Sequence, residues 1–205
     1  MFSRLVAPTE DDDTEADDAS LIQRSIVDPR EFGALYARHA AAIHRYVVRR
    51  LGDAVADDVV AETFLIAFRG RARYDSARRT ASPWLYGIAS NVIAKHHRAE
   101  TRMYRAYLRA GAEAGAEPTL DRVENRVMAA GWQRELAGAL VQLSAKDRDV
   151  LLLIAWADLS YEEISQALGI PVGTVRSRLN RARRKVRSAL GDINPMAADE
   201  EPRNE

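Results

Sequence analysis

The chain has 205 residues, and its 30 basic and 30 acidic side chains give a formal net charge of +0 at pH 7. It contains no cysteine, which excludes disulfides and thiolate metal sites and is compatible with a reducing compartment. No run of 18 apolar residues is present, and the first residues lack the basic-then-apolar layout of a signal peptide. We therefore expect a cytoplasmic protein with no membrane insertion.

The balanced charge conceals a partition along the chain. Residues 1–20 carry a net charge of −6 and residues 191–205 a net charge of −4, so the 170 residues between them carry +10. A basic body between acidic ends is typical of a protein that binds a polyanion. We expect both ends, residues 1–27 and 191–205, to be acidic, solvated and disordered.

Helical periodicity begins after the first acidic segment. The sequence Asp28-Pro29-Arg30-Glu31 predicts a capped helix start, and apolar residues then recur at steps of three and four up to Gly52. A second helix is predicted over about 54–71, followed by a polar, basic stretch. Ser82-Pro83 predicts a third helix that continues as a basic rod to about residue 108.

The second half of the chain is also predicted to be helical. Residues 111–119, GAEAGAEPT, are small and weakly charged and predict a flexible linker. A helix over about 120–143 and another over 145–156, capped by Ser144, are expected to follow. Because we find neither a strand pattern nor an internal repeat, we predict an all-α protein with two small helical domains, at 28–110 and 120–190.

Residues 160–190 predict a helix-turn-helix. Ser160 and Glu163 have the spacing of a capping box, Gly169 suits the left-handed conformation of a helix end, and Pro171 suits the start of a second helix. That second helix, up to Leu190, holds seven basic residues and no acidic one. Such a helix reads DNA in the major groove. The alternative is an ordinary helical hairpin with a solvated basic face.

Several segments resemble sigma factors of bacterial RNA polymerase, in the extracytoplasmic-function (ECF) group. LSAKDRDVLLL (143–153) and LSYEEISQALGIPVGTVRSRLNRAR (159–183) are similar to the family's fourth region, which reads the minus-thirty-five promoter element. DDVVAETFLIAFR (57–69) resembles the helix that docks on the clamp helices of the polymerase's largest subunit. PWLYGIASN (83–91) resembles the part of the second region that melts and reads the minus-ten element.

The chain departs from the usual family pattern at three positions. Ala61 stands where glutamine is usual, Lys95 where aspartate is common, and Ser165 where the helix-turn-helix usually has alanine. The resemblance still implies a sigma-2-like domain of three or four helices and a sigma-4-like helix-turn-helix domain. The partners that it implies are core RNA polymerase and promoter DNA, with an anti-sigma factor as a further candidate.

The predicted polymerase-docking face lies on the helix over 54–71. Asp57, Asp58 and Glu62 place carboxylates on one side of this helix, beside Thr63 and Phe64. The resemblance assigns this face to a coiled coil that presents arginines. The alternative is that the acidic residues solvate the helix and complement its amino-terminal dipole.

The predicted minus-thirty-five contacts lie on the second helix of the helix-turn-helix. Val175 and Leu179 are expected to face the protein, which turns Arg176 and Asn180 toward the groove. Arginine can pair with guanine there, and asparagine with adenine. Other basic residues on this helix are expected to bind phosphates. The predicted set is Thr174, Arg176, Ser177, Arg178, Asn180, Arg181, Arg184 and Lys185.

The predicted melting surface combines basic and aromatic residues. Residues 66–109 hold ten Lys or Arg against two acidic residues, with aromatic side chains among them, which suits the capture of single-stranded DNA. The resemblance assigns a flipped base to the loop over 74–82. Trp84 has a competing interpretation as a core residue. The predicted set is Tyr74, Arg78, Arg79, Trp84, Tyr86, Asn91, Lys95 and Arg98.

Catalysis and cofactors are not expected. His96 and His97 are adjacent, so on a helix their side chains point about 100° apart and do not suit one metal ion. We find no nucleophile-base constellation and no phosphate-binding glycine loop. Two alternatives to a sigma factor stay open: a one-component helix-turn-helix regulator that does not touch polymerase, and a helical nucleic-acid-processing enzyme.

Overall fold

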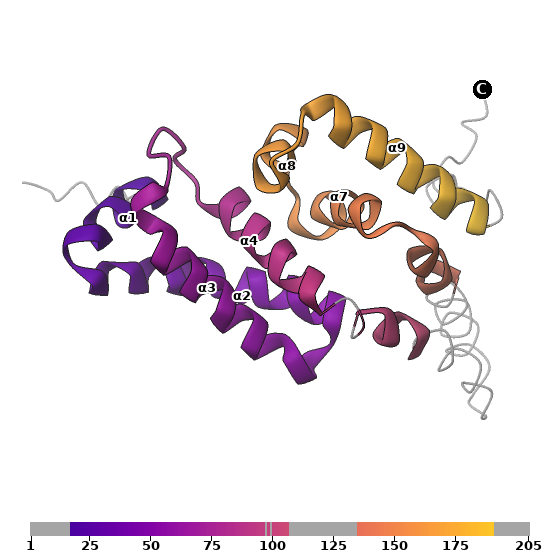
Figure 1. Cartoon of the computed structure of the whole chain (residues 1–205), viewed down its shortest axis with the longest axis horizontal. Helices are drawn as coiled ribbons and strands as arrows, with labels where there is room; N and C mark the ends of the chain where they lie inside the picture. Colours follow the sequence, from indigo (N-terminus) through magenta and orange to yellow (C-terminus); the bar gives the residue numbers. More distant parts are fainter. Residues whose placement is uncertain (1–16, 97, 99, 107–134, 191–205) are drawn as a thin grey trace, which may run out of the picture.

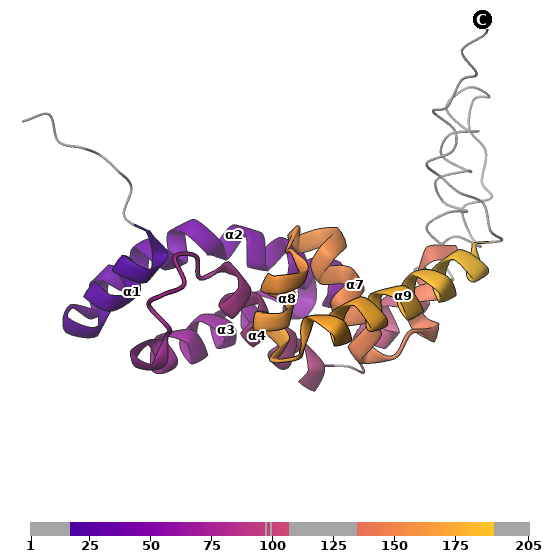
Figure 2. The same cartoon turned by 90° about the horizontal axis from the view of Figure 1, so that it is seen from above.

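The computed structural model describes residues 17–96, 98, 100–106 and 135–190 (Figures 1 and 2). Every regular element within these ranges is a helix, which confirms the all-α prediction. The predicted linker at 111–119, the first half of the predicted helix over 120–143, and the acidic segments at 1–16 and 191–205 lie outside the described residues.

The first helix, α1, spans Asp18–Val27. Asp17 caps it, because its Oδ1 accepts a hydrogen bond of 2.9 Å from the amide of Ser20. Leu21 and Ile22 are buried. The prediction of a disordered tail is therefore wrong for residues 18–27, because this segment has both a cap and an apolar face that packs against α2.

Helix α2 spans Phe32–Leu51 and is the longest in the described residues. It follows a single 3-10 turn, η1 at Pro29–Glu31, in which the Asp28 carboxylate accepts from the amide of Arg30 at 3.0 Å. The predicted helix start is thus confirmed, with a 3-10 first turn. Gly52 ends α2 at a φ of 81°, a conformation that favours glycine.

Helix α3 spans Ala56–Gly70 and lies between two 3-10 turns, η2 at Asp53–Val55 and η3 at Arg71–Arg73. An irregular loop then leads to α4, Ser82–Lys95. The predicted continuous basic rod is wrong, because α4 ends at Lys95 with His96 as its cap, whereas Arg98 and residues 100–106 are again helical. Helices α2, α3 and α4 pack together as the amino-terminal domain.

The carboxy-terminal domain contains helical residues at 135–142, then α7 at Ala145–Ala157, α8 at Tyr161–Leu168 and α9 at Val172–Ala189. The capping box of Ser160 and Glu163 is present in both directions, at 3.2 and 2.8 Å. Gly169 adopts a φ of 61° between α8 and α9. The predicted helix-turn-helix is confirmed.

The two domains lie against each other, with α8 packed on α4 (Figures 1 and 2). Gly87 of α4 faces α8 so closely that an added Cβ would lie 2.2 Å from the carbonyl oxygen of Ala167. Only glycine permits this approach.

A buried group of charges also joins the domains, and we call it the interdomain ionic cluster: Arg50, Glu100, Arg148 and Asp149. Glu100 is paired with Arg50 at 2.5 Å and with Arg148 at 2.9 Å, and Arg50 also reaches Asp149 at 2.7 Å. The side chains of Arg50 and Glu100 are each 2% exposed. Burial acts to lower the pKa of Arg50, but the charges around it raise it well above its ordinary value, so the guanidinium stays charged.

Candidate nucleic-acid interface

Helix α9 presents a basic face on the outside of the molecule. Its apolar residues Val175, Leu179 and Ala182 are buried, and α9 packs on α7, as its helical spacing predicted. Thr174 and Arg178 are partly buried. The predicted contact residues that stand exposed are Arg176, Ser177, Asn180, Arg181, Arg184 and Lys185.

Two of the exposed arginines are supported by neighbouring elements. Arg181 pairs with Asp147 of α7 at 3.1 Å, and the side chain of Asp147 is 8% exposed. Burial acts to raise the pKa of Asp147, but hydrogen bonds with Arg181 and Ser144 lower it below its ordinary value. The guanidinium of Arg176 lies 6.0 Å from the ring centre of Tyr161. These contacts orient both side chains on the outer face of α9.

The loop between α3 and α4, residues 74–81, is organised by Tyr74. The hydroxyl of Tyr74 lies 2.8 Å from the carbonyl oxygens of both Arg78 and Thr80, and its ring lies 4.9 Å from that of Trp84. Burial raises the pKa of Tyr74 to about 12, so its hydroxyl remains a donor at neutral pH. We call residues 74–81 the α3–α4 loop.

Two predicted base-stacking residues are not available at the surface. Tyr74 is 8% exposed, and Tyr86 is 5% exposed with its ring edge-to-face against Tyr46 at 5.2 Å. Their prediction as stacking surfaces is wrong, because both rings belong to the core. Trp84 is partly buried and packs against the same core.

The remaining predicted melting residues are exposed: Arg78, Arg79, Asn91, Lys95 and Arg98. Arg78 pairs with Asp75 at 3.1 Å and also lies 3.3 Å from the side-chain oxygen of Gln166 in α8. Lys95 pairs with Glu62 of α3 at 2.6 Å. The structure thus places a predicted DNA residue beside a predicted docking residue, a contact that residue spacing did not indicate.

The predicted docking face of α3 is only partly exposed. Asp57 is 94% exposed, Asp58 is exposed and Glu62 is half-buried. Thr63 and Phe64 are buried, and the Thr63 hydroxyl donates to the carbonyl of Val59 at 2.7 Å. Their prediction as direct docking residues is wrong, because this side of α3 packs into the domain core.

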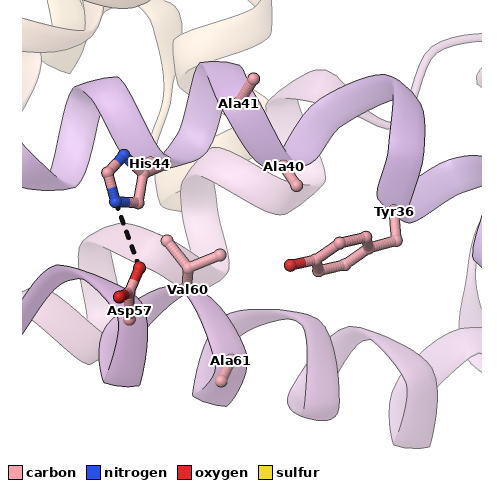
Figure 3. Close-up of a pocket in the computed structure, with 7 residues that line it drawn as sticks. All are labelled: Tyr36, Ala40, Ala41, His44, Asp57, Val60 and Ala61. Carbon is pink, nitrogen blue, oxygen red and sulfur yellow. Dashed lines mark ion pairs between the residues drawn. The ribbon is translucent and has the colours of Figure 1, made fainter.

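A groove between α2 and α3 adjoins the exposed acidic residues and was not predicted (Figure 3). It has a volume of about 440 Å³. Tyr36 is 48% exposed here, and His44 lies 3.3 Å from Asp57 across the groove. The lining residues are Tyr36, Ala40, Ala41, His44, Asp57, Val60 and Ala61.

Neither a metal centre nor a membrane span is found in the part of the chain that the structure describes. No group of three or more His, Asp or Glu side chains there could hold a metal ion. Among the described helices, none combines the length and apolar character needed to cross a bilayer. The fold and its exposed basic faces define a helical DNA-binding protein with a helix-turn-helix.

Comparison with known proteins identifies the family. Residues 35–103 match the model of Sigma-70 region 2, and residues 133–186 match that of Sigma-70, region 4. The ECF RNA polymerase sigma factor SigL of Mycobacterium tuberculosis is 35% identical over 161 residues, covering 78% of this chain and 89% of the relative. The RNA polymerase sigma factor CarQ of Myxococcus xanthus is 32% identical over 165 residues, covering 79% and 90%.

A solved structure agrees on the fold. CnrH, in complex with the cytosolic domain of CnrY, has a TM-score of 0.60 and 24% sequence identity, covering 86% of this chain and 99% of that one. The chain belongs to the sigma-70 family of RNA polymerase sigma factors, in the ECF group.

Proposed function

We propose that this chain binds core RNA polymerase in the cytoplasm and directs promoter recognition, melting and transcription initiation, without catalysing a reaction itself. The observation that carries the proposal is the presence, in one chain, of both sigma-70 regions with the exposed basic helix α9 and the basic α3–α4 loop. The prediction of an anti-sigma partner stays a prediction.

In this proposal α9 reads the minus-thirty-five element. Arg176 and Asn180 face outward and suit hydrogen bonds with base edges in the major groove. Arg184 and Lys185, one to two turns further along, suit phosphate contacts, which add affinity without base preference. Arg181 must exchange its bond with Asp147 for a DNA contact, or hold α9 in place while its neighbours read the bases.

The α3–α4 loop and the exposed basic residues near it bind the melted minus-ten strand in this proposal. Arg78, Arg79, Lys95 and Arg98 supply positive charge, while the buried Tyr74 holds the loop in shape. Changing Arg78 and Arg79 to alanine should leave polymerase binding intact but abolish initiation on closed duplex. A template with a pre-melted bubble should restore much of the activity, because unpairing costs a few kcal/mol that the loop no longer offsets.

The proposed polymerase contact is the acidic face of α3 with the neighbouring groove. Asp57, Asp58 and Glu62 complement the arginines that the resemblance assigns to the polymerase's clamp helices, and the half-exposed Tyr36 adds apolar contact area. Charge reversal across such an interface costs several kcal/mol.

Binding to core polymerase tests this docking face. The double variant Asp58→Arg with Glu62→Arg should lose binding to core polymerase in a pull-down. A double variant with the same change in charge, Glu135→Arg with Glu162→Arg, lies in the carboxy-terminal domain and should retain it. Equal binding by both variants would contradict the docking assignment. A regulator of the alternative type would instead bind its site alone, as a symmetric dimer.

Reading both promoter elements at once requires the two domains to separate. The elements lie about 25 base pairs apart, which at about 3.4 Å each is roughly 85 Å. A compact chain of 205 residues has a radius of gyration of about 17 Å, so its diameter is roughly half of that distance. The contact between Gly87 and Ala167 and the interdomain ionic cluster are therefore expected to open on the promoter.

A further inference from the structure

The carboxylate of Asp18 connects α1 to the α3–α4 loop. Its Oδ1 accepts from Arg38 Nη1 at 2.7 Å. Its Oδ2 accepts from the backbone amide of Ala81 at 2.7 Å and lies 2.8 Å from His39 Nε2. Ala81 is the last residue of the loop and the cap of α4. One side chain of α1 thus binds both α2 and the point where the loop enters α4.

This contact is buried and strongly favoured in the charged form. The Asp18 side chain is 5% exposed, so its ionised state needs several hydrogen bonds to offset the loss of water. Burial acts to raise the pKa of Asp18, but bonds from His39, the Ala81 amide and Arg38 lower it to about 2. The carboxylate is therefore charged, and fixed in place, throughout the physiological pH range.

Two further contacts restrain the same loop. The carboxylate of Asp17 lies 3.3 Å from Nε of Arg79, whose side chain is 85% exposed. Inside the loop, Tyr74 binds the carbonyls of Arg78 and Thr80. The loop is thus held from within by Tyr74 and from outside by two consecutive residues of the α1 start. Its exposed arginines project from a backbone that these contacts restrain.

We propose that Asp18 is a positioning residue that sets the conformation of the α3–α4 loop and thereby the base preference for the melted minus-ten strand. The proposal rests on the proposed function, because it presumes that this loop receives a base. Helix α1 lies before the residues that match the Sigma-70 region 2 model, which begin at residue 35. The shape of the base-binding loop is then set partly by a segment outside the matched region.

The energetic reason is preorganisation. A loop that already has its binding conformation loses less conformational entropy when the strand arrives, and it disfavours bases that would require another shape. Each mismatched base in a site typically costs about 1–3 kcal/mol, which corresponds to roughly 5- to 150-fold in affinity. A loop released at Ala81 can adapt to several bases, so we expect it to lose most of this discrimination.

The test compares variants of the full chain assembled with core RNA polymerase. Asp18→Ala removes the acceptor for the Ala81 amide, whereas Asp18→Asn keeps a carbonyl oxygen but loses the charge. The measured quantity is the affinity for single-stranded oligonucleotides that carry each of the four bases at the minus-ten positions. A matched control is Asp28→Ala, which removes another capping aspartate of the same domain, bound to Arg30 and not to the loop.

We expect Asp18→Ala to reduce the ratio between the best and the worst base by about tenfold. Asp18→Asn should lie between Asp18→Ala and the wild type, and Asp28→Ala should match the wild type. Affinity for core polymerase and for minus-thirty-five duplex should not change in any of the three. If Asp18→Ala fails to fold, the affinity ratio of Asp18→Asn decides whether Asp18 sets the base preference, since asparagine preserves the shape of the side chain.

The outcomes separate this proposal from the proposed function. A wild-type holoenzyme without base preference on the minus-ten strand would refute the proposed function of the loop. A wild type with a clear preference that both Asp18 variants retain in full would refute only the positioning role. Equal loss of affinity for all four bases, with the ratio unchanged, would also overturn it, because it would reduce Asp18 to a purely structural residue.

Discussion

Replacement of Glu100 by alanine should strongly destabilise the protein, because Glu100 neutralises two buried arginines. Its Oε1 accepts from Arg50 at 2.8 and 2.5 Å, and its Oε2 accepts from Arg148 at 2.9 Å. Without Glu100, Arg50 keeps its ion pair with Asp149, but the ion pair between Arg148 and Glu100 is lost. Breaking a buried ion pair by removing one partner costs about 3–5 kcal/mol.

Other contacts do not replace the lost charge. Arg148 keeps hydrogen bonds to the carbonyls of Leu140 and Leu143, and Arg50 keeps the hydroxyl of Tyr46. These neutral acceptors satisfy donors but leave the buried positive charge in excess. Since small domains are stable by about 5–15 kcal/mol in total, the expected loss is a large share of the free energy of unfolding.

Urea unfolding of the full chain, followed by circular dichroism, measures this loss. The control is Glu62→Ala, which removes an ion pair of 2.6 Å with Lys95 that is largely exposed to water. Such exposed pairs contribute about 0–1 kcal/mol. Losses of similar size for Glu100→Ala and Glu62→Ala would refute the reasoning that the interdomain ionic cluster depends on Glu100.

Three further predictions concern DNA reading, domain packing and acid stability. Arg176→Ala should reduce the binding free energy for the preferred minus-thirty-five duplex by about 1–3 kcal/mol and relax the base preference. Lys185→Ala should weaken binding to all sequences alike and lower the slope of log affinity against log salt concentration by about one. Binding titrations at several salt concentrations distinguish the two. Gly87→Ala should drive α8 away from α4, while the control Gly33→Ala should not, because the space around its added Cβ is open. Since the chain has no native cysteine, single labels can be attached to introduced cysteines on α2 and α9, and the distance between them measures the separation. The pKa of Asp18 in the folded protein is lowered from 3.8 to about 2. Asp18→Asn should therefore reduce the free energy of unfolding by roughly 2 kcal/mol at pH 7. This difference should vanish as the pH falls from about 5 to 2, which unfolding measurements across pH would show.

Local signals predicted the helix-turn-helix well. Ser160, Glu163 and Gly169 each act within a few residues along the chain, so their roles in capping and turning follow from sequence alone. The basic outer face of α9 followed from helical spacing once Val175 and Leu179 were taken as buried. The direction of this face depends only on residues within α9, and not on the rest of the fold.

Burial of particular side chains was harder to predict, because it depends on how helices pack. Thr63 and Phe64 lie next to an exposed acidic face, but one turn of helix carries both a buried and an exposed side. Tyr74 lies in a polar, arginine-rich stretch, and only its contacts with Trp84 and the loop carbonyls reveal a structural role. Basic surroundings alone did not distinguish a stacking ring from a buried one.

Contacts between distant residues left no signal in the sequence. The partners in the interdomain ionic cluster are separated by about 50 to 100 positions, as in the bonds from Arg50 to Glu100 and to Asp149. Asp18 was assigned to an acidic tail because the strongly negative charge of residues 1–20 concealed the short apolar face of α1. Asp17 followed by Leu21 and Ile22 was the available signal for a capped amphipathic helix.

The most direct test of the central claim is transcription in vitro with core RNA polymerase on a library of genomic fragments, with the 5′ ends of the transcripts mapped. We expect the chain to direct initiation at a limited set of sites that share two upstream elements. Initiation should be lost with the Asp58→Arg, Glu62→Arg double variant. Transcript ends identical to those of core polymerase alone, together with binding of the free chain to duplex DNA as a symmetric dimer, would contradict the account.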